Sequence, residues 1–152
     1  MVRILILLKT RRLEIRPAVF LLLVALSCCA CEPSPSKNLS GPVNDSLYQA
    51  WQQQRSDVQL SGSGVVTRVL SDDTKGSRHQ RFILKINAHQ TILIAHNIDL
   101  APRITGLREG DVVEFYGEYE WNKKGGVVHW THKDPNNRHA HGWLRHRGKQ
   151  YW

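Results

Sequence analysis

The segment LREGDVVEFYGEY, residues 107–119, decides the fold that the sequence predicts. A Gly110–Asp111 turn leads into a run in which apolar and polar residues alternate, as in a half-buried strand. Other runs rich in Val, Ile, Phe, Tyr and Trp have the composition that strands prefer. We therefore predict strands at residues 58–70, 78–86, 90–98, 111–121 and 127–132.

The order and spacing of these strands indicate an OB-fold, a five-stranded Greek-key barrel. Gly62 and Gly64 suggest a bulge or a sharp bend in the first strand. Residues 99–110 form a connection between the third and fourth strands. The predicted fold class is thus all-β, a small OB-like barrel, with an open meander or another small barrel as the alternative.

A short helix precedes the barrel in this prediction. Asn44 or Asp45 is a candidate N-cap, because a side-chain oxygen there accepts a backbone N–H of the first turn. Leu47, Ala50 and Trp51 fall on one helical face and could lie against the barrel.

The amino terminus, residues 1–31, is typical of an export signal. Five cations and one anion up to Arg16 precede an apolar run, Ala18–Leu26, which ends in small residues and cysteines. The run is short for a membrane span, and a retained membrane anchor is the alternative. Residues 32–44 are rich in Pro and Ser and predict a tether, so residues 45–152 remain for the barrel domain.

All three cysteines lie at the end of the signal, at positions 28, 29 and 31. The domain itself therefore has no disulfide and no thiolate metal site. Small residues before a cysteine are similar to a bacterial lipobox, which makes Cys28 and Cys31 candidate acylation sites. The expected location is the periplasmic side of a bacterial membrane, with the protein held by a lipid anchor.

Charge is divided unevenly along the chain. Residues 28–120 hold nine cations and eleven anions, whereas residues 121–152 hold seven cations, one anion and five of the eight histidines. A basic, histidine-rich segment favours an anionic partner, such as nucleic acid, phosphate, lipid headgroups or surface polysaccharide.

Four histidines, His129, His132, His139 and His141, are candidate metal ligands, and zinc is the ion that imidazole would suit. On an extended strand His129 and His132 point to opposite faces, whereas His139 and His141 share one. The alternative is a basic surface in which imidazole supplements Lys and Arg. We favour that alternative because the spacing matches no established metal motif.

Other polar and aromatic residues are candidate ligand contacts. His79 and Arg81 are expected to point outward from the second strand, where they would suit an anionic chain or simply face solvent. His96 with Asp99 could be a general base and its partner, although Asn97 and Asp99 more often cap a turn. Trp121, Trp130 and Trp143 could stack on nucleotides or sugars, or cover the core.

Several phrases of the chain resemble a family of small exported bacterial proteins known only as domain of unknown function 3465. They are DDTKGSRHQRFIL (72–84), LIAHNIDLAPRI (93–104), GDVVEFYGEYEWN (110–122) and GGVVHWTH (125–132), and the likeness covers about Gly62 to Tyr151. The residues that fill its motifs are Asp73, Gly76, His79, Gln80, His96, Asn97, Asp99, Gly117, His129, Trp130, His132 and Pro135. The resemblance implies no activity.

These observations predict a binding module for an anionic or oligomeric ligand, with no cofactor unless zinc binds. The alternatives are a metal-dependent hydrolase that uses the histidines and a structural envelope lipoprotein. The enzyme hypothesis is weaker because the sequence shows no nucleophile, base and orienting group together.

Overall fold

The computed structural model describes residues 42–152. The predicted signal, the acylation candidates Cys28 and Cys31, and residues 32–41 of the predicted tether lie outside the described residues. The elements are α1 (Pro42–Gln52), β1 (Val58–Val69), β2 (His79–Lys85), β3 (Thr91–Asn97), β4 (Val112–Glu120), β5 (Val127–His129), β6 (Trp143–His146) and β7 (Lys149–Tyr151). Among the described residues, no helix has the length and apolar character needed to cross a membrane.

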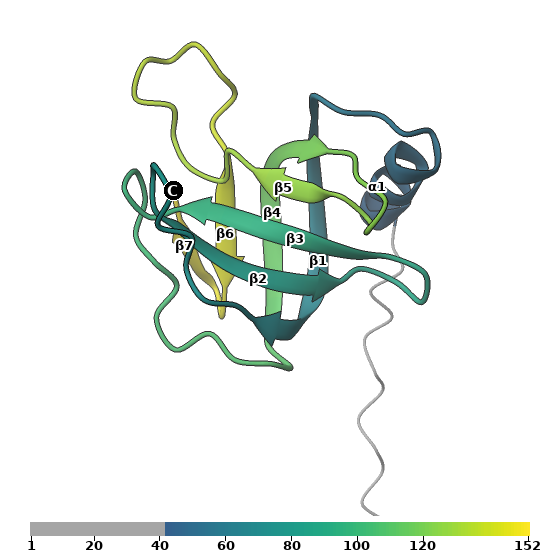
Figure 1. Cartoon of the computed structure of the whole chain (residues 1–152), viewed down its shortest axis with the longest axis horizontal. Helices are drawn as coiled ribbons and strands as arrows, with labels where there is room; N and C mark the ends of the chain where they lie inside the picture. The colour runs from purple at the N-terminus through teal and green to yellow at the C-terminus, as the bar shows by residue number, and fades with distance from the viewer. Residues whose placement is uncertain (1–41) are drawn as a thin grey trace, which may run out of the picture. The chain divides into compact units, whose positions relative to one another are not determined.

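Five strands close into a barrel in the order β1-β2-β3-β5-β4, with β4 pairing back to β1 (Figure 1). All neighbours are antiparallel except β3 and β5, which are parallel. Buried and exposed residues alternate along β2, β3 and β4, so one side of each strand forms the core. The predicted all-β, OB-like barrel is confirmed, and the first four strands end within two residues of their expected limits.

The fifth strand is shorter than predicted, because β5 ends at His129 and not at His132. Trp130 has a φ of 51°, in the left-handed region that a strand cannot accommodate. The chain leaves the sheet there as a long loop, residues 130–142, and rejoins it at β6. Strands β5 and β6 then lie one after the other along the same edge of β4.

The hairpin β6–β7 was not predicted. Its turn is formed by Arg147 and Gly148, whose φ values of 49° and 78° are those of a tight two-residue hairpin. The strands are short and rich in cations, so they lack the apolar run that indicates a strand. Leu144 and Tyr151 nevertheless pair across the hairpin and are buried in the core.

Gly62 and Gly64 were predicted to form a bulge or a sharp bend, and of these two the bulge does not occur there. The irregularity in β1 lies between Val66 and Arg68, whereas both glycines pair regularly with β4. Each faces the interior without room for a side chain. A Cβ on Gly62 would lie 2.3 Å from the Phe115 ring, and one on Gly64 would lie 2.8 Å from a backbone oxygen of β2.

Helix α1 closes one end of the barrel, which we call the helix end. Leu47 and Ala50 are buried in the core, and Trp51 packs against it. The helix begins at Pro42, so neither Asn44 nor Asp45, the two N-cap candidates of the sequence, is the N-cap. The Asn44 amide instead exchanges hydrogen bonds with the backbone of Ser63 and donates to the carbonyl of Ile86.

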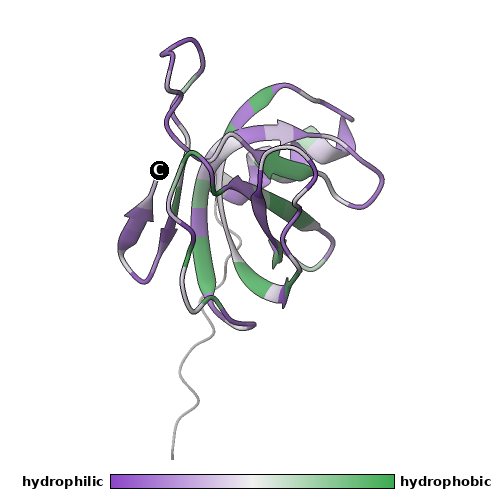
Figure 2. Cartoon of the chain, turned by 60° about the vertical axis from the view of Figure 1, so that its left-hand side comes forward, coloured by the Kyte–Doolittle hydropathy of each residue, from purple (hydrophilic) through white to green (hydrophobic). Residues whose placement is uncertain are grey.

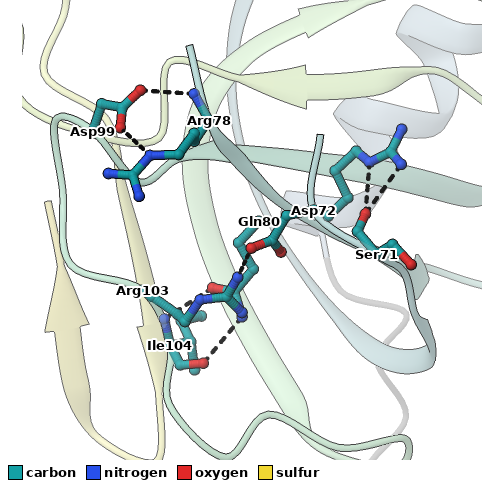
Figure 3. A network of polar contacts seen from close by, with 8 residues as sticks. Ser71, Asp72, Arg78, Gln80, Asp99, Arg103 and Ile104 are labelled. Atoms are coloured by element: carbon teal, nitrogen blue, oxygen red, sulfur yellow. Dashed lines mark hydrogen bonds and ion pairs between the residues drawn. The ribbon is translucent and has the colours of Figure 1, made fainter. Parts of the chain in front are cut away.

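The opposite end, which we call the loop end, carries the β1–β2 loop, the β3–β4 connection and the loop 130–142. The β3–β4 connection buries Ile104 against the core. The buried Gln80 amide donates to the Ile104 carbonyl (3.0 Å) and accepts from its N–H (2.9 Å), as Figure 3 shows. One side chain therefore satisfies both backbone groups of a buried loop residue.

His96 is inside the barrel at the loop end, fully buried, and does not contact Asp99 as a base and its partner would. Its Nδ1 lies 2.9 Å from Thr131 Oγ1 and its Nε2 lies 3.1 Å from the carbonyl of Pro102. The carbonyl only accepts, so Nε2 donates and Nδ1 accepts from the hydroxyl. Burial lowers the pKa of His96 to about 4, which keeps the ring neutral.

This buried histidine predicts acid sensitivity. Between pH 6.5 and 4 the unfolded state binds a proton that the folded state does not, so stability falls as the pH is lowered through this range. The full loss from His96 is about 3 kcal/mol. In His96→Gln, urea unfolding should show lower stability near neutral pH and a stability difference from wild type that shrinks towards about pH 4.5. A constant difference would contradict this assignment, and His89→Gln, in an exposed turn, is the control.

Candidate functional site

The outer face of β4 carries a row of polar and aromatic residues that meet partners from the neighbouring strands. Glu114 lies opposite Arg145, Tyr116 opposite Trp143, and Glu118 opposite His129. The Arg145 guanidinium donates to Glu114 at 3.1 Å, and the rings of Tyr116 and Trp143 lie 6.4 Å apart. Such directly opposed pairs are the units that stabilise a sheet surface.

This row brings acidic side chains next to part of the basic carboxy-terminal segment, residues 121–152. Five basic side chains of this segment lie beside acidic residues of β4 or of the turn before it, namely His129, His139, Arg145, His146 and Arg147. Arg147 donates to Asp111 at 2.9 Å, and this bond, with the Arg108 N–H, lowers the pKa of Asp111 to about 2. Two of the seven Lys and Arg side chains of residues 121–152, Arg145 and Arg147, therefore pair with residues 111–120, and the segment keeps a smaller net positive charge.

Ion pairs also neutralise the arginines around the β1–β2 loop (Figure 3). Arg78 bonds Asp99 through its backbone N–H and its guanidinium, both at 2.7 Å, and these bonds lower the pKa of Asp99. Arg103 pairs with Asp72. Asn97 accepts the Asp99 N–H at 2.9 Å, which is the capping role that we considered for this stretch.

A small pocket opens on the outer face of β3 and β5 at the loop end. Its volume is about 130 Å³, and we call it the imidazole pocket; its lining residues are His79, Ala95, Asn97, Leu100, His129, Trp130 and His132. The lining contains three imidazoles, one amide and one indole but no carboxylate. The pocket forms here because β3 continues past the end of β5. The turn at Trp130 then brings the start of the loop 130–142 beside the end of β3.

The loop 130–142 is organised around Asp134, which is 6 % exposed. Its carboxylate accepts the backbone N–H groups of Asn136, Arg138 and His139, and the pKa of Asp134 lies below its ordinary value as a result. Figure 2 shows this loop as a mostly hydrophilic projection above the barrel. The carboxylate thus fixes a polar loop that has little apolar surface to bury.

Trp130 and His139 stack, with ring centroids 4.3 Å apart and planes 14° from parallel. His139 Nδ1 donates to the Ala140 carbonyl, and Nε2 contacts a carboxylate oxygen of Glu118. Both partners are acceptors, so both ring nitrogens must carry protons. Burial opposes this charge, but the bonds to Ala140 and Glu118 prevail, and the pKa of His139 is raised.

The four histidines of the proposed metal set do not converge. His132 donates from Nδ1 to the carbonyl of Lys133, and His141 accepts the Asp134 N–H at Nδ1. His129 and His139 instead approach Glu118. Within the described residues, no three of the four imidazoles offer nitrogens within 4.8 Å of one another.

The other predicted contacts do not gather at one site, and Trp143 lies beside Tyr116 in the row on β4. His79 and Arg81 face outward, as expected, but only His79 lines the imidazole pocket; Arg81 binds the carbonyl of Ser71. Trp130 lines the pocket. Trp121 lies at the helix end, where its indole donates to the carbonyl of Trp51.

Sequence reasoning missed Leu100 in the pocket and the two glutamates Glu118 and Glu120 beside it. The glutamates alternate outward on β4, a signal that the sequence carries. Their approach to His129 became visible only from the pairing of β4 with β5.

A comparison with curated proteins gives no match to this chain. One family model matches, over residues 35–152, and its description is "Protein of unknown function (DUF3465)". The match covers the whole barrel and all the residues of the imidazole pocket. The chain therefore belongs to the DUF3465 family, as the resemblance of its motifs indicated.

Proposed function

We propose that this protein is an exported, lipid-anchored binding module on the periplasmic side of a bacterial membrane. Its OB-fold barrel would bind one anionic group of an oligomeric ligand, such as a nucleic acid, a polyphosphate or an acidic saccharide, in the imidazole pocket. The observation that carries the proposal is the lining of that pocket, which offers N–H donors from several elements and no carboxylate.

The size of the pocket supports an oligomeric ligand over a compact one. At about 130 Å³ it is smaller than the 300–1,000 Å³ typical of pockets for whole small molecules. It has room for a group of about the size of a phosphate. The rest of a longer ligand would continue over the outer face of the sheet, as oligomers do on other OB-folds.

The chemistry of the lining supports an anion. The Nδ1 proton of His132 is donated to the Lys133 carbonyl, which fixes the orientation of this ring in the lining. The ring of His79 makes no hydrogen bond within the described residues, so it can bind a ligand without losing an internal partner. Trp130, whose ring stacks on His139, contributes its indole to the lining of the pocket.

If an anionic ligand binds in the imidazole pocket, one substitution in its lining should lower the affinity for that ligand. We expect His79→Gln to weaken binding of tripolyphosphate, a single-stranded oligonucleotide or a heparin oligosaccharide about tenfold, since a charged hydrogen bond contributes about 1.5–3 kcal/mol. Affinity should fall with added salt, because binding releases counterions. Calorimetry with each probe would identify the ligand class.

The control is His89→Gln, which changes an exposed histidine in the turn at the helix end. Equal affinities in the two variants, or no binding of any anionic oligomer by the wild type, would contradict the proposed function.

The lipid anchor predicts a modified amino terminus. When the full chain is expressed in a Gram-negative bacterium, mass spectrometry should find an acylated cysteine, Cys28 or Cys31, at the start of the mature protein. A mature protein that begins at another residue and carries no lipid would reject the anchor.

A further inference from the structure

Two glutamates and a histidine meet on the outer face of the barrel. Glu118 and Glu120 are two residues apart on β4, so both side chains point outward. His129 lies directly opposite Glu118 on β5. The hydrogen-bonded register of two barrel strands therefore fixes the three side chains on one surface.

The spacing between the donor atoms suits an ion. His129 Nε2 lies 3.7 Å from a carboxylate oxygen of Glu118 and 3.9 Å from one of Glu120, and all three donor atoms lie within 4.8 Å of one another. These distances are too long for hydrogen bonds. They are close to the separation of about 3.3 Å between two ligands that each bind a tetrahedral ion at 2.0–2.1 Å.

The carboxylates of this group face only imidazoles, with His139 on Glu118, whereas neighbouring acids pair with arginines. Glu114 and Asp111 pair with Arg145 and Arg147. Within the described part of the chain, no Lys or Arg lies within 4 Å of Glu118 or Glu120, whose side chains are only 17 % and 31 % exposed. Two half-buried carboxylates on one face repel each other, and a divalent cation would remove that repulsion.

Glu118 is also oriented for such a role. One of its oxygens contacts His139 Nε2, and the other is directed towards His129. His139 is held in turn by the stacked ring of Trp130 and by the carbonyl of Ala140. A carboxylate fixed through one oxygen by a neighbouring group is typical of metal ligands.

We propose that Glu118, Glu120 and His129 bind one divalent transition-metal ion. His139 is a positioning residue, which acts through Glu118. One imidazole with two carboxylates favours zinc or manganese over calcium and magnesium, which prefer oxygen donors alone. Three protein donors leave at least one coordination position for water or another ligand.

The test uses metal alone, so it is independent of the proposed anionic ligand. The full chain, purified without a histidine tag and stripped with chelator, is titrated with zinc chloride and with manganese chloride by calorimetry. We expect one ion per chain and a rise in melting temperature on addition of metal. Magnesium and calcium should bind at least tenfold more weakly than the better of the two transition metals.

Glu120→Gln and His129→Gln should each weaken the binding at least tenfold and abolish the rise in melting temperature. Both positions are on the outer face, and circular dichroism without metal would verify that the variants fold. Glu114→Gln, on the same outer row of β4, is the matched control and should bind like the wild type. His139→Gln should weaken binding less than His129→Gln, because its effect passes through Glu118.

Three results would overturn the assignment. They are the absence of saturable binding of either transition metal, equal affinities in Glu120→Gln and Glu114→Gln, and binding that survives His129→Gln but is lost in His132→Gln or His141→Gln. The last would assign the ion to the histidines of the loop 130–142.

Discussion

The whole structure depends on one strand that pairs with two others. The first part of β1, Val58–Val65, pairs with β4, and its continuation from Val65 to Val69 pairs with β2. This double pairing closes the barrel. Gly62 and Gly64 permit the close approach of Phe115 and of β2 within the closed barrel. Larger residues at these positions would separate the strands.

Closure of the barrel then determines which side chains lie on its outer face. Alternation along each strand places Phe82, Ile94, Phe115 and Val128 in the core and leaves the intervening polar residues exposed. Because β5 and β6 share one edge of β4, the loop 130–142 leaves the sheet between them. The imidazole pocket and the cluster of Glu118, Glu120 and His129 lie on either side of the point where it leaves, and His129 belongs to both.

The sequence predicted the features of the fold that depend on residues adjacent in the chain. The alternation of β2, β3 and β4 is a local pattern, so these strands and the outward side of His79 and Arg81 followed from it. The hairpin β6–β7 was missed because its strands are short and polar and its core contacts are made with distant residues. A single left-handed residue, Trp130, ended the fifth strand and invalidated the face assignments beyond it.

The candidate site was harder to predict because it depends on contacts between distant segments. Charge counted along the chain suggested a basic carboxy-terminal surface. In the fold, Arg145 and Arg147 pair with Glu114 and Asp111, more than thirty residues earlier, so part of the positive excess is neutralised. The histidines separate for the same reason, since each is placed by a different partner.

The most direct test of the account is a nuclear magnetic resonance titration of the isotope-labelled protein with tripolyphosphate. If the imidazole pocket binds an anionic group, the largest shifts should occur at the Trp130 indole N–H and at the backbone amides of His79, Asn97 and His132. Shifts confined to Trp51 and Trp121 at the helix end, or no saturable shifts at all, would contradict the central claim.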